Sequence, residues 1–252
     1  MIETTQHDGV TELRLARPPA NALSPELLTA LFDAVHASTV SGARALVLSG
    51  APGMFSAGLD VPEFLKLDRP AVREAWRILF RAMHALAASP IPVVAALTGH
   101  APAGGCVLAL CCDARVLAEG RFKIGLNEVQ VGVRAPLPIL AVARHVVGTR
   151  QAERMLTTAE LFGGEEALRI GLVDEIVPAD EVVARSIERA RAWTQLPQKT
   201  LAKTRQLARA EPIAALENVD AAEEERFLDE WFDDECQGAL QALVDRLAAK
   251  KT

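Results

Sequence analysis

The stretch TGHAPAGGCVLALCCD, residues 98–113, decides how the sequence is interpreted. It has no Asp, Glu, Lys or Arg before its last position, and Pro102, Gly99, Gly104 and Gly105 all lie in its first half. A strand that ends in such a turn and continues into a helix leaves backbone N–H groups unpaired. Those N–H groups and the helix dipole bind anions or developing negative charge. The stretch therefore predicts a strand, a turn that another molecule can approach closely, and a helix.

The apolar segment around this stretch runs from residue 89 to residue 112 without a charged side chain. That length suggests a membrane span. Pro90, Pro92, Pro102 and several glycines interrupt it, so two elements of a globular protein joined by a turn are the better interpretation. The 4 cysteines include no CxxC pair. Their pattern argues against a zinc site or a disulfide framework and favours a reducing compartment.

The composition is that of a globular protein with a sizeable core. The chain has 252 residues, of which 50% are hydrophobic, and a formal net charge of −6. It lacks the basic stripe that nucleic-acid binding needs. The first residues, MIETTQHDGV, include an early acid and no apolar run, so neither a signal peptide nor a transit peptide is predicted. We expect a cytoplasmic protein with no nucleic-acid partner and no membrane partner.

Strand and helix patterns alternate along the rest of the chain. Residues 10–16 alternate apolar and polar after a hairpin turn at Asp8-Gly9, and Ser24-Pro25-Glu26 starts a helix. Further strands are expected at 44–49, 92–97, 114–118 and 171–177, and further helices at about 70–88, from about 104, at 136–146 and at 150–157. From Pro178 onward the pattern is almost entirely helical, with breaks near Pro197 and Pro212. This order predicts an α/β fold with a core domain over residues 1–195 and a helical C-terminal region over 196–252 for oligomer contacts or a lid.

Two glycine-rich segments are candidates for a binding site, FSAGLD at 55–60 and PAGG at 102–105. Neither GxxxxGK[ST] nor GxGxxG occurs, which disfavours a nucleotide loop. An oxyanion hole needs two N–H groups that point to one place, usually from two separate segments. Composition alone favours two tightly packed turns instead, because glycine-rich turns are common.

Three segments together resemble the crotonase superfamily, the enoyl-CoA hydratase/isomerase family. They are MFSAGLD at 54–60, GHAPAGGCVLALCCDARVLAEGRFKIGLNEVQVG at 99–132 and GEEALRIGLVDEIVP at 164–178. The resemblance covers about residues 10–180. It implies the crotonase (ClpP/crotonase-like) fold of repeated ββα units with a helical C-terminal part. It also implies a coenzyme A thioester as substrate, no cofactor and no metal, and a homotrimer or a dimer of trimers.

The resemblance also assigns the catalytic groups. The backbone N–H groups of Ala57 and Gly104 would hold the thioester oxygen, and Glu128 in GLNE would be the acid/base. Many hydratases of the family carry a second glutamate three residues after the oxyanion glycine, and here that position is Val107. One carboxylate can remove a proton from C2 and return it to C4, whereas hydration asks for two groups. The segments PAGGC, IGLNE and QVGV likewise resemble the mitochondrial-type Δ3,Δ2-enoyl-CoA isomerases.

The positions that the resemblance assigns to substrate and coenzyme A binding are Ala20, Ala22, Ser56, Leu59, Asp60, Gly105, Val107 and Asn127. Several further roles stay open. Asn127 orients Glu128 or caps a turn, and His100 is a second acid/base or a packed or CoA-adjacent side chain. The other open positions are Trp76, Phe80 and Met83 for the acyl pocket or the core, Arg17 and Lys66 for the phosphates, and Leu240, Leu243 and Leu247 for an interface or a lid.

The expected function is a Δ3,Δ2-enoyl-CoA isomerase that acts in the β-oxidation of unsaturated fatty acids. One alternative is another reaction of the family, such as hydration, thioester hydrolysis or decarboxylation. A second alternative is a non-catalytic acyl-CoA-binding or RNA-binding homologue. The acidic composition argues against RNA, and the presence of Glu128 argues against an inactive enzyme.

Overall fold

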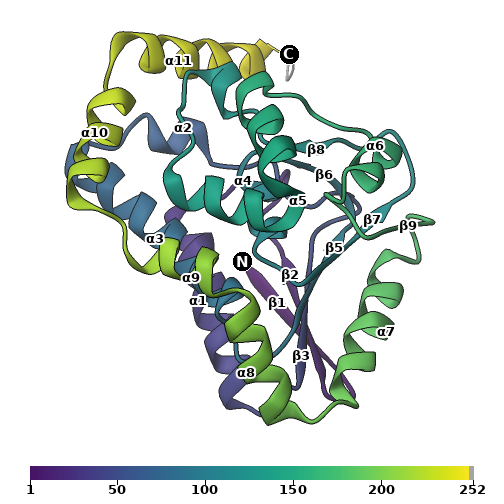
Figure 1. The fold of residues 1–252 in the computed structure, drawn as a ribbon. Helices are drawn as coiled ribbons and strands as arrows, with labels where there is room; N and C mark the ends of the chain where they lie inside the picture. The colour runs from purple at the N-terminus through teal and green to yellow at the C-terminus, as the bar shows by residue number, and fades with distance from the viewer. Residues whose placement is uncertain (250–252) are drawn as a thin grey trace.

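A six-stranded sheet runs through the computed structural model, which describes residues 1–249 (Figure 1). The strand order is β1-β2-β3-β5-β7-β9. The strands are β1 (Ile2–His7), β2 (Val10–Leu15), β3 (Ala45–Ser49), β5 (Val93–Leu97), β7 (Ala114–Ala118) and β9 (Glu175–Val177). The β1–β2 hairpin is antiparallel, and all other pairs in this sheet are parallel. Every residue of β3, β5 and β7 is buried, as expected for parallel strands covered on both faces.

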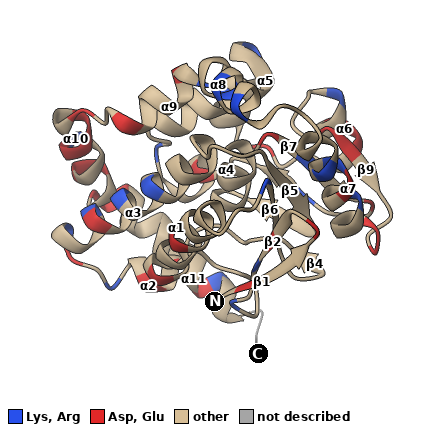
Figure 2. Ribbon diagram, turned by 90° about the horizontal axis from the view of Figure 1, so that it is seen from below, with Lys and Arg blue, Asp and Glu red and all other residues tan. Residues whose placement is uncertain are grey.

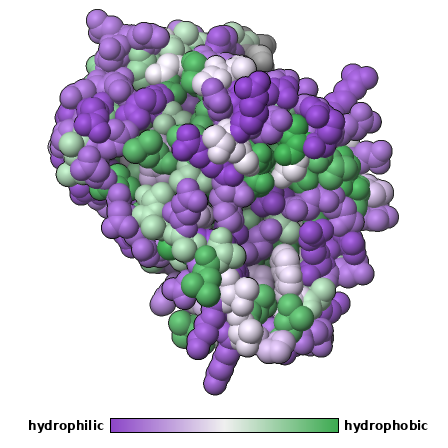
Figure 3. Space-filling view, viewed as in Figure 1, coloured by the Kyte–Doolittle hydropathy of each residue, from purple (hydrophilic) through white to green (hydrophobic). Residues whose placement is uncertain are grey.

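Helices cover both faces of this sheet. One face packs against α7 (Val182–Thr194), which stands apart from the other helices in Figure 1. The other face carries the larger core, to which α1 (Pro25–Val40), α3 (Arg69–Ala87) and α4 (Gly104–Leu110) contribute. Ser24 caps α1 as the sequence predicts, because its Oγ accepts the Leu27 N–H at 3.2 Å. The face in Figure 3 is mainly hydrophilic, with apolar residues scattered among polar ones.

A second, three-stranded sheet positions the candidate site. It consists of β4 (Gly53–Met54), β6 (Gly99–Pro102) and β8 (Ile124–Gly125), all parallel, in the order β4-β6-β8. The three strands follow β3, β5 and β7 along the chain after short breaks. Their carboxyl ends therefore bring the 55–60 loop, the turn at Ala103 and the residues Asn127 and Glu128 to one edge.

The remaining elements are helical and mostly lie in the second half of the chain. They are α2 (Val61–Phe64), a 3-10 helix η1 (Glu128–Val131), α5 (Leu137–Thr158), α6 (Gly164–Arg169), α8 (Gln198–Ala208), α9 (Ala210–Glu217), α10 (Ala221–Trp231) and α11 (Asp234–Ala249). In Figure 1, α8 lies at one end of the molecule and α11 at the other. None of the helices described combines the length and the apolar character that crossing a membrane requires.

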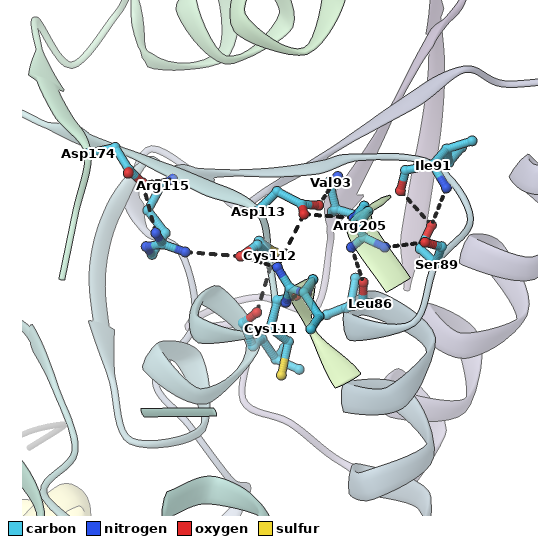
Figure 4. Close-up of polar contacts among 12 residues, drawn as sticks. Leu86, Ser89, Ile91, Val93, Cys111, Cys112, Asp113, Arg115, Asp174 and Arg205 are labelled. Atoms are coloured by element: carbon cyan, nitrogen blue, oxygen red, sulfur yellow. Dashed lines mark hydrogen bonds and ion pairs between the residues drawn. The ribbon is translucent and has the colours of Figure 1, made fainter. Parts of the chain in front are cut away.

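A buried polar cluster attaches α8 and α9 to the carboxyl end of α4 (Figure 4). Asp113 Oδ1 accepts hydrogen bonds from Arg205 Nε at 2.7 Å and from Arg209 Nη1 at 3.2 Å. The Arg209 guanidinium also donates to the Cys111 carbonyl at 2.5 Å, and Arg115 donates to the Cys112 carbonyl at 3.0 Å. These donors satisfy carbonyl groups that the end of a helix leaves unpaired.

The predicted α/β fold with a helical C-terminal part is confirmed, with local corrections. The strand expected at 171–177 is limited to β9, because residues 171–174 form a turn. The two helices expected at 136–146 and 150–157 are confirmed, since the element α5 consists of two helices that meet at a kink at the non-helical Gly148. Pro212 lies near the start of α9, and the chain breaks its helix at Arg209 instead. The predicted division at residue 195 falls between α7 and α8.

Candidate active site

A cavity of about 620 Å³ opens at the edge where β4, β6 and β8 end. Nine of the residues predicted for the site line it: Ala20, Ala22, Ala57, Leu59, Asp60, Gly104, Val107, Asn127 and Glu128. Ser56 and Gly105 do not belong to its wall. A volume of this size is typical of a small-molecule site.

The two glycine-rich segments contact each other directly at the cavity. Gly58 has φ +87°, and a Cβ atom there would lie 3.0 Å from Ala103 Cβ and 3.1 Å from the Gly104 nitrogen. A Cβ atom on Gly104 would lie 2.8 Å from Leu23 Cδ1. Glycine is therefore required at both positions for close packing, and at Gly58 also for the left-handed backbone.

The two predicted oxyanion donors differ in their hydrogen bonding. Gly104 begins α4, and its N–H finds no partner within residues 1–249. The Ala57 N–H donates to the Ala20 carbonyl at 3.0 Å. One donor is therefore free, and the other is held by the loop around Ala20.

Ser56 and Asn21 connect the loop at residues 17–23 to the 55–60 loop. The buried Ser56 hydroxyl donates to the Asn21 carbonyl at 2.8 Å and accepts the Gly58 N–H at 3.2 Å. The Asn21 side-chain amide donates to the Phe55 carbonyl at 3.0 Å. Ser56 does not line the cavity, but its hydrogen bonds hold the two loops that do. This explains why a small polar residue lies at position 56.

Glu128 is the buried carboxylate of the site. It follows β8 as the first residue of η1, and its side chain is only 9% exposed although it lines the cavity. Among residues 1–249, its Oε2 atom has no hydrogen-bond partner, and neither has Oδ1 of the adjacent Asn127. Burial raises the pKa of Glu128 to about 7, against the opposing effect of a backbone hydrogen bond. The group is thus able both to accept and to donate a proton near neutral pH.

Val107 gives the cavity an apolar wall on α4. It is 1% exposed and lines the cavity together with Glu128. Among the described lining residues, Asp60 is the other carboxylate. It caps α2 through the Glu63 N–H and pairs with Arg17 at 2.7 Å. Val107 thus occupies the position where many hydratases of the resembled family carry a second glutamate, and no further carboxylate besides Glu128 and Asp60 is found among the described lining residues.

The residues whose roles the sequence left open separate clearly. The His100 ring packs edge-on against Phe122 with centroids 5.3 Å apart, and its Nδ1 accepts the Lys123 N–H at 3.2 Å. His100 is outside the cavity wall, which fits the packing interpretation. Arg17 lines the cavity, but its guanidinium is engaged by Asp60, by Glu63 and by the Ala22 carbonyl.

Of the three residues considered for an acyl pocket on α3, only Trp76 lines the cavity. Met83 is buried in the core, and Phe80 lines a separate surface hollow. The leucine stripe of α11 covers the cavity: Leu240, Leu243 and Leu247 all line it. Within this chain the stripe therefore faces the cavity.

Sequence analysis missed several apolar residues of the wall, namely Leu79, Val131, Val133, Ile139, Leu161 and Trp231. Trp231 is the most prominent, since it closes the cavity from α10. Its only sequence signal is a large aromatic residue on a helix in which acidic residues predominate. Within the part of the chain that the structure describes, no three His, Cys, Asp or Glu side chains are grouped so as to hold a metal ion.

Comparison with known proteins places this arrangement in a family. Residues 5–250 match the enoyl-CoA hydratase/isomerase family. The chain is 34% identical over its whole length to mouse mitochondrial enoyl-CoA delta isomerase 1 and covers 88% of that protein. It is also 34% identical to a probable enoyl-CoA hydratase of Mycobacterium avium, over 82% of this chain and 83% of the relative.

A solved structure agrees with these relatives. The crystal structure of human mitochondrial Δ3-Δ2-enoyl-CoA isomerase superposes with a TM-score of 0.95 at 31% identity, covering 100% of this chain and 99% of the other. The glycine-rich contact, the buried glutamate and α11 thus lie on a known scaffold. The chain belongs to the enoyl-CoA hydratase/isomerase family and has the crotonase fold.

Proposed function

We propose that the protein is a Δ3,Δ2-enoyl-CoA isomerase, which moves the double bond of a 3-enoyl-CoA to the trans-2 position. The observation that carries the proposal is Glu128, buried in an apolar cavity that Val107 also lines. Such a site offers one proton-transferring group and excludes water. The named isomerases among the relatives support the same reaction.

The proton shift needs only this one carboxyl group. The Glu128 carboxylate removes a proton from C2, and the C–H electron pair enters the conjugated system as a dienolate. The protonated Glu128 then returns the proton to C4. The double bond moves from C3–C4 to C2–C3, Glu128 is again a carboxylate, and substrate and product have the same atoms. N–H groups at Gly104 and Ala57 stabilise the negative oxygen more than the neutral thioester, and one such donor contributes roughly 3 kcal/mol.

A hydratase is the second candidate, because one of the relatives is a probable enoyl-CoA hydratase. Hydration needs a bound water that one group activates while another assists proton delivery. Val107 offers neither a hydrogen bond to water nor a proton. The cavity wall therefore favours isomerisation over hydration.

We further propose a cytoplasmic homotrimer or dimer of trimers, with no cofactor and no metal. Val129 and Leu137 support a contact between subunits, since they are 52% and 56% exposed and lie at η1 and at the start of α5. The isomerases among the relatives are named mitochondrial, so cellular location needs its own test. Light scattering of the purified protein measures the subunit number, and fractionation of the source cells measures the location.

The activity is tested with paired substrates. 3-Hexenoyl-CoA reports isomerisation through formation of the 2-enoyl product, and crotonyl-CoA reports hydration through loss of its double bond. The wild-type protein is expected to isomerise rapidly and hydrate negligibly, and Glu128→Gln is expected to lose isomerisation. Efficient hydration, or isomerisation that survives in Glu128→Gln, would contradict the proposal.

A further inference from the structure

Apolar side chains on different helices form two walls of the cavity. One wall comes from α3 and α10 and contains Trp76, Leu79 and Trp231. The other comes from α11 and contains Leu243, Val244 and Leu247. An acyl chain whose carbonyl lies at Gly104 has to follow one of these walls.

The two walls differ in their contact with solvent. Trp76 is 4% exposed and Trp231 is 2% exposed, whereas exposure along α11 increases from 1% at Leu240 to 44% at Leu247. A chain that ran along α11 would bring its methyl end toward water. A chain that ran toward the two tryptophans would bury it, and burial of apolar surface is favourable. The methyl end of the acyl chain is therefore more favourably bound against the α3–α10 wall.

This wall is closed by packed aromatic rings. The Trp76 and Trp231 rings stand edge to face with centroids 5.9 Å apart. Phe227 packs on Trp76 at 4.6 Å, and Phe64 packs on Trp231 at 6.0 Å. Rings held on both sides cannot swing away without disturbing the core.

Ion pairs also fix the helix that carries Trp231. On α10, Glu225 pairs with Arg69 at 2.9 Å, and Glu224 pairs with Arg77 at 2.8 Å. Its Glu223 pairs with Arg134 at 2.6 Å. Figure 2 shows the acidic residues of α10 in red and the basic residues of α3 in blue on neighbouring helices. The network holds α10 against α3, so the position of Trp231 is set by the fold.

We propose that Trp231, supported by Trp76, forms the closed end of the acyl site and sets the longest acyl chain that the enzyme accepts. The proposal rests on the proposed acyl-CoA function of the cavity. Chains that end before the tryptophan wall gain apolar burial with each methylene. Longer chains have to bend back toward solvent under α11 and gain nothing further.

Binding tests this proposal without turnover. The chain has 3 tryptophans, and the third, Trp193, lies on α7 with the apolar group on the opposite face of the large sheet. In a Trp193→Phe protein, emission therefore comes only from the two tryptophans of the cavity. Saturated acyl-CoA esters of increasing length are expected to shift this emission to shorter wavelength from the length at which the methyl end reaches the rings. An emission response independent of chain length would overturn the proposal.

Catalysis gives the second measurement. For 3-hexenoyl-, 3-octenoyl-, 3-decenoyl- and 3-dodecenoyl-CoA, kcat/KM is expected to rise by roughly fourfold per added methylene and then to level off or fall. The chain length at which kcat/KM stops rising is called the break. Trp231→Ala is expected to move the break to a longer chain, and Trp231→Phe is expected to move it less. Leu247→Ala tests the wall of α11 and is expected to leave the break in place.

The outcomes separate the two proposals. Should Trp231→Ala fail to fold, Trp231→Phe and the emission titration still decide the question. A break that moves with Leu247→Ala and not with the Trp231 variants overturns the assignment of the closed end. If the wild-type protein binds acyl-CoA esters of none of these lengths and isomerises none of the 3-enoyl-CoA substrates, the proposed function itself is contradicted.

Discussion

Replacing Glu128 with Gln is expected to stabilise the folded protein above neutral pH while removing its isomerase activity. Burial raises the pKa of Glu128 from 4.5 to about 7. Between these values the folded state holds a proton that the unfolded state has released. Stability contributed by this group is therefore fully present below about pH 4.5 and is lost as the pH rises toward 7.

The magnitude follows from the two pKa values. Moving the pKa from 4.5 to about 7 corresponds to roughly 3 kcal/mol of lost stability once the pH is well above 7. Gln has nearly the shape of the protonated acid and does not ionise. The variant is expected to match the wild type near pH 4 and to exceed its free energy of unfolding by roughly 3 kcal/mol near pH 8.5.

Urea unfolding of both proteins at the two pH values measures this difference. Glu74→Gln is the matched control, because Glu74 is an exposed residue of α3 and its replacement is expected to change little at either pH. Equal pH dependence in the wild type and in Glu128→Gln would refute the reasoning. It would mean that Glu128 ionises in the folded protein as it does in the unfolded chain.

Three further predictions concern the pH profile and two other side chains. Isomerisation kcat/KM of the wild type is expected to rise with pH through an apparent pKa of about 7, because Glu128 has to be ionised to take the first proton; a flat profile between pH 5 and 9 would contradict this role. Gly104→Ala keeps the N–H but places a Cβ 2.8 Å from Leu23 Cδ1 and 3.2 Å from Gly58 Cα, so it is expected to displace the donor and lower kcat by roughly tenfold, whereas an unchanged kcat would argue against a tight contact between the two glycine-rich segments. Asp113→Ala leaves two buried guanidinium groups without their shared acceptor and is expected to lower the free energy of unfolding by about 3–5 kcal/mol in urea, whereas Asp180→Ala at an exposed turn is expected to have little effect.

The large sheet was predictable because its strands have strong local patterns. Residues 45–48 and 92–97 are continuous apolar runs, and both correspond to buried strands. The strands β4 and β8 have only two residues each, too few for any periodic pattern. β1 is mostly exposed and polar, and it is held by pairing to β2 rather than by a buried face.

The centre of the site was predictable because each segment carries its own signature. Glu128, Gly104 and Ala57 lie in three separate motifs, and the short sheet brings their ends to one edge. Trp231 has no such signature, since its place in the cavity depends on how α10 crosses α3. The same holds for Arg205, a basic residue on a polar helix that tertiary packing buries beside Asp113.

The hydrogen bond from the Ala57 N–H to the Ala20 carbonyl affects how the site would discriminate between states of the substrate. A neutral thioester oxygen that took the place of Ala20 would exchange one carbonyl acceptor for another and gain little. An oxygen that carries the charge of a dienolate is a much stronger acceptor, so the same exchange becomes favourable only as the proton leaves C2. In the proposed reaction, the Ala20 carbonyl would thus keep the Ala57 N–H from stabilising the complex with unreacted substrate, and the N–H would stabilise mainly the dienolate.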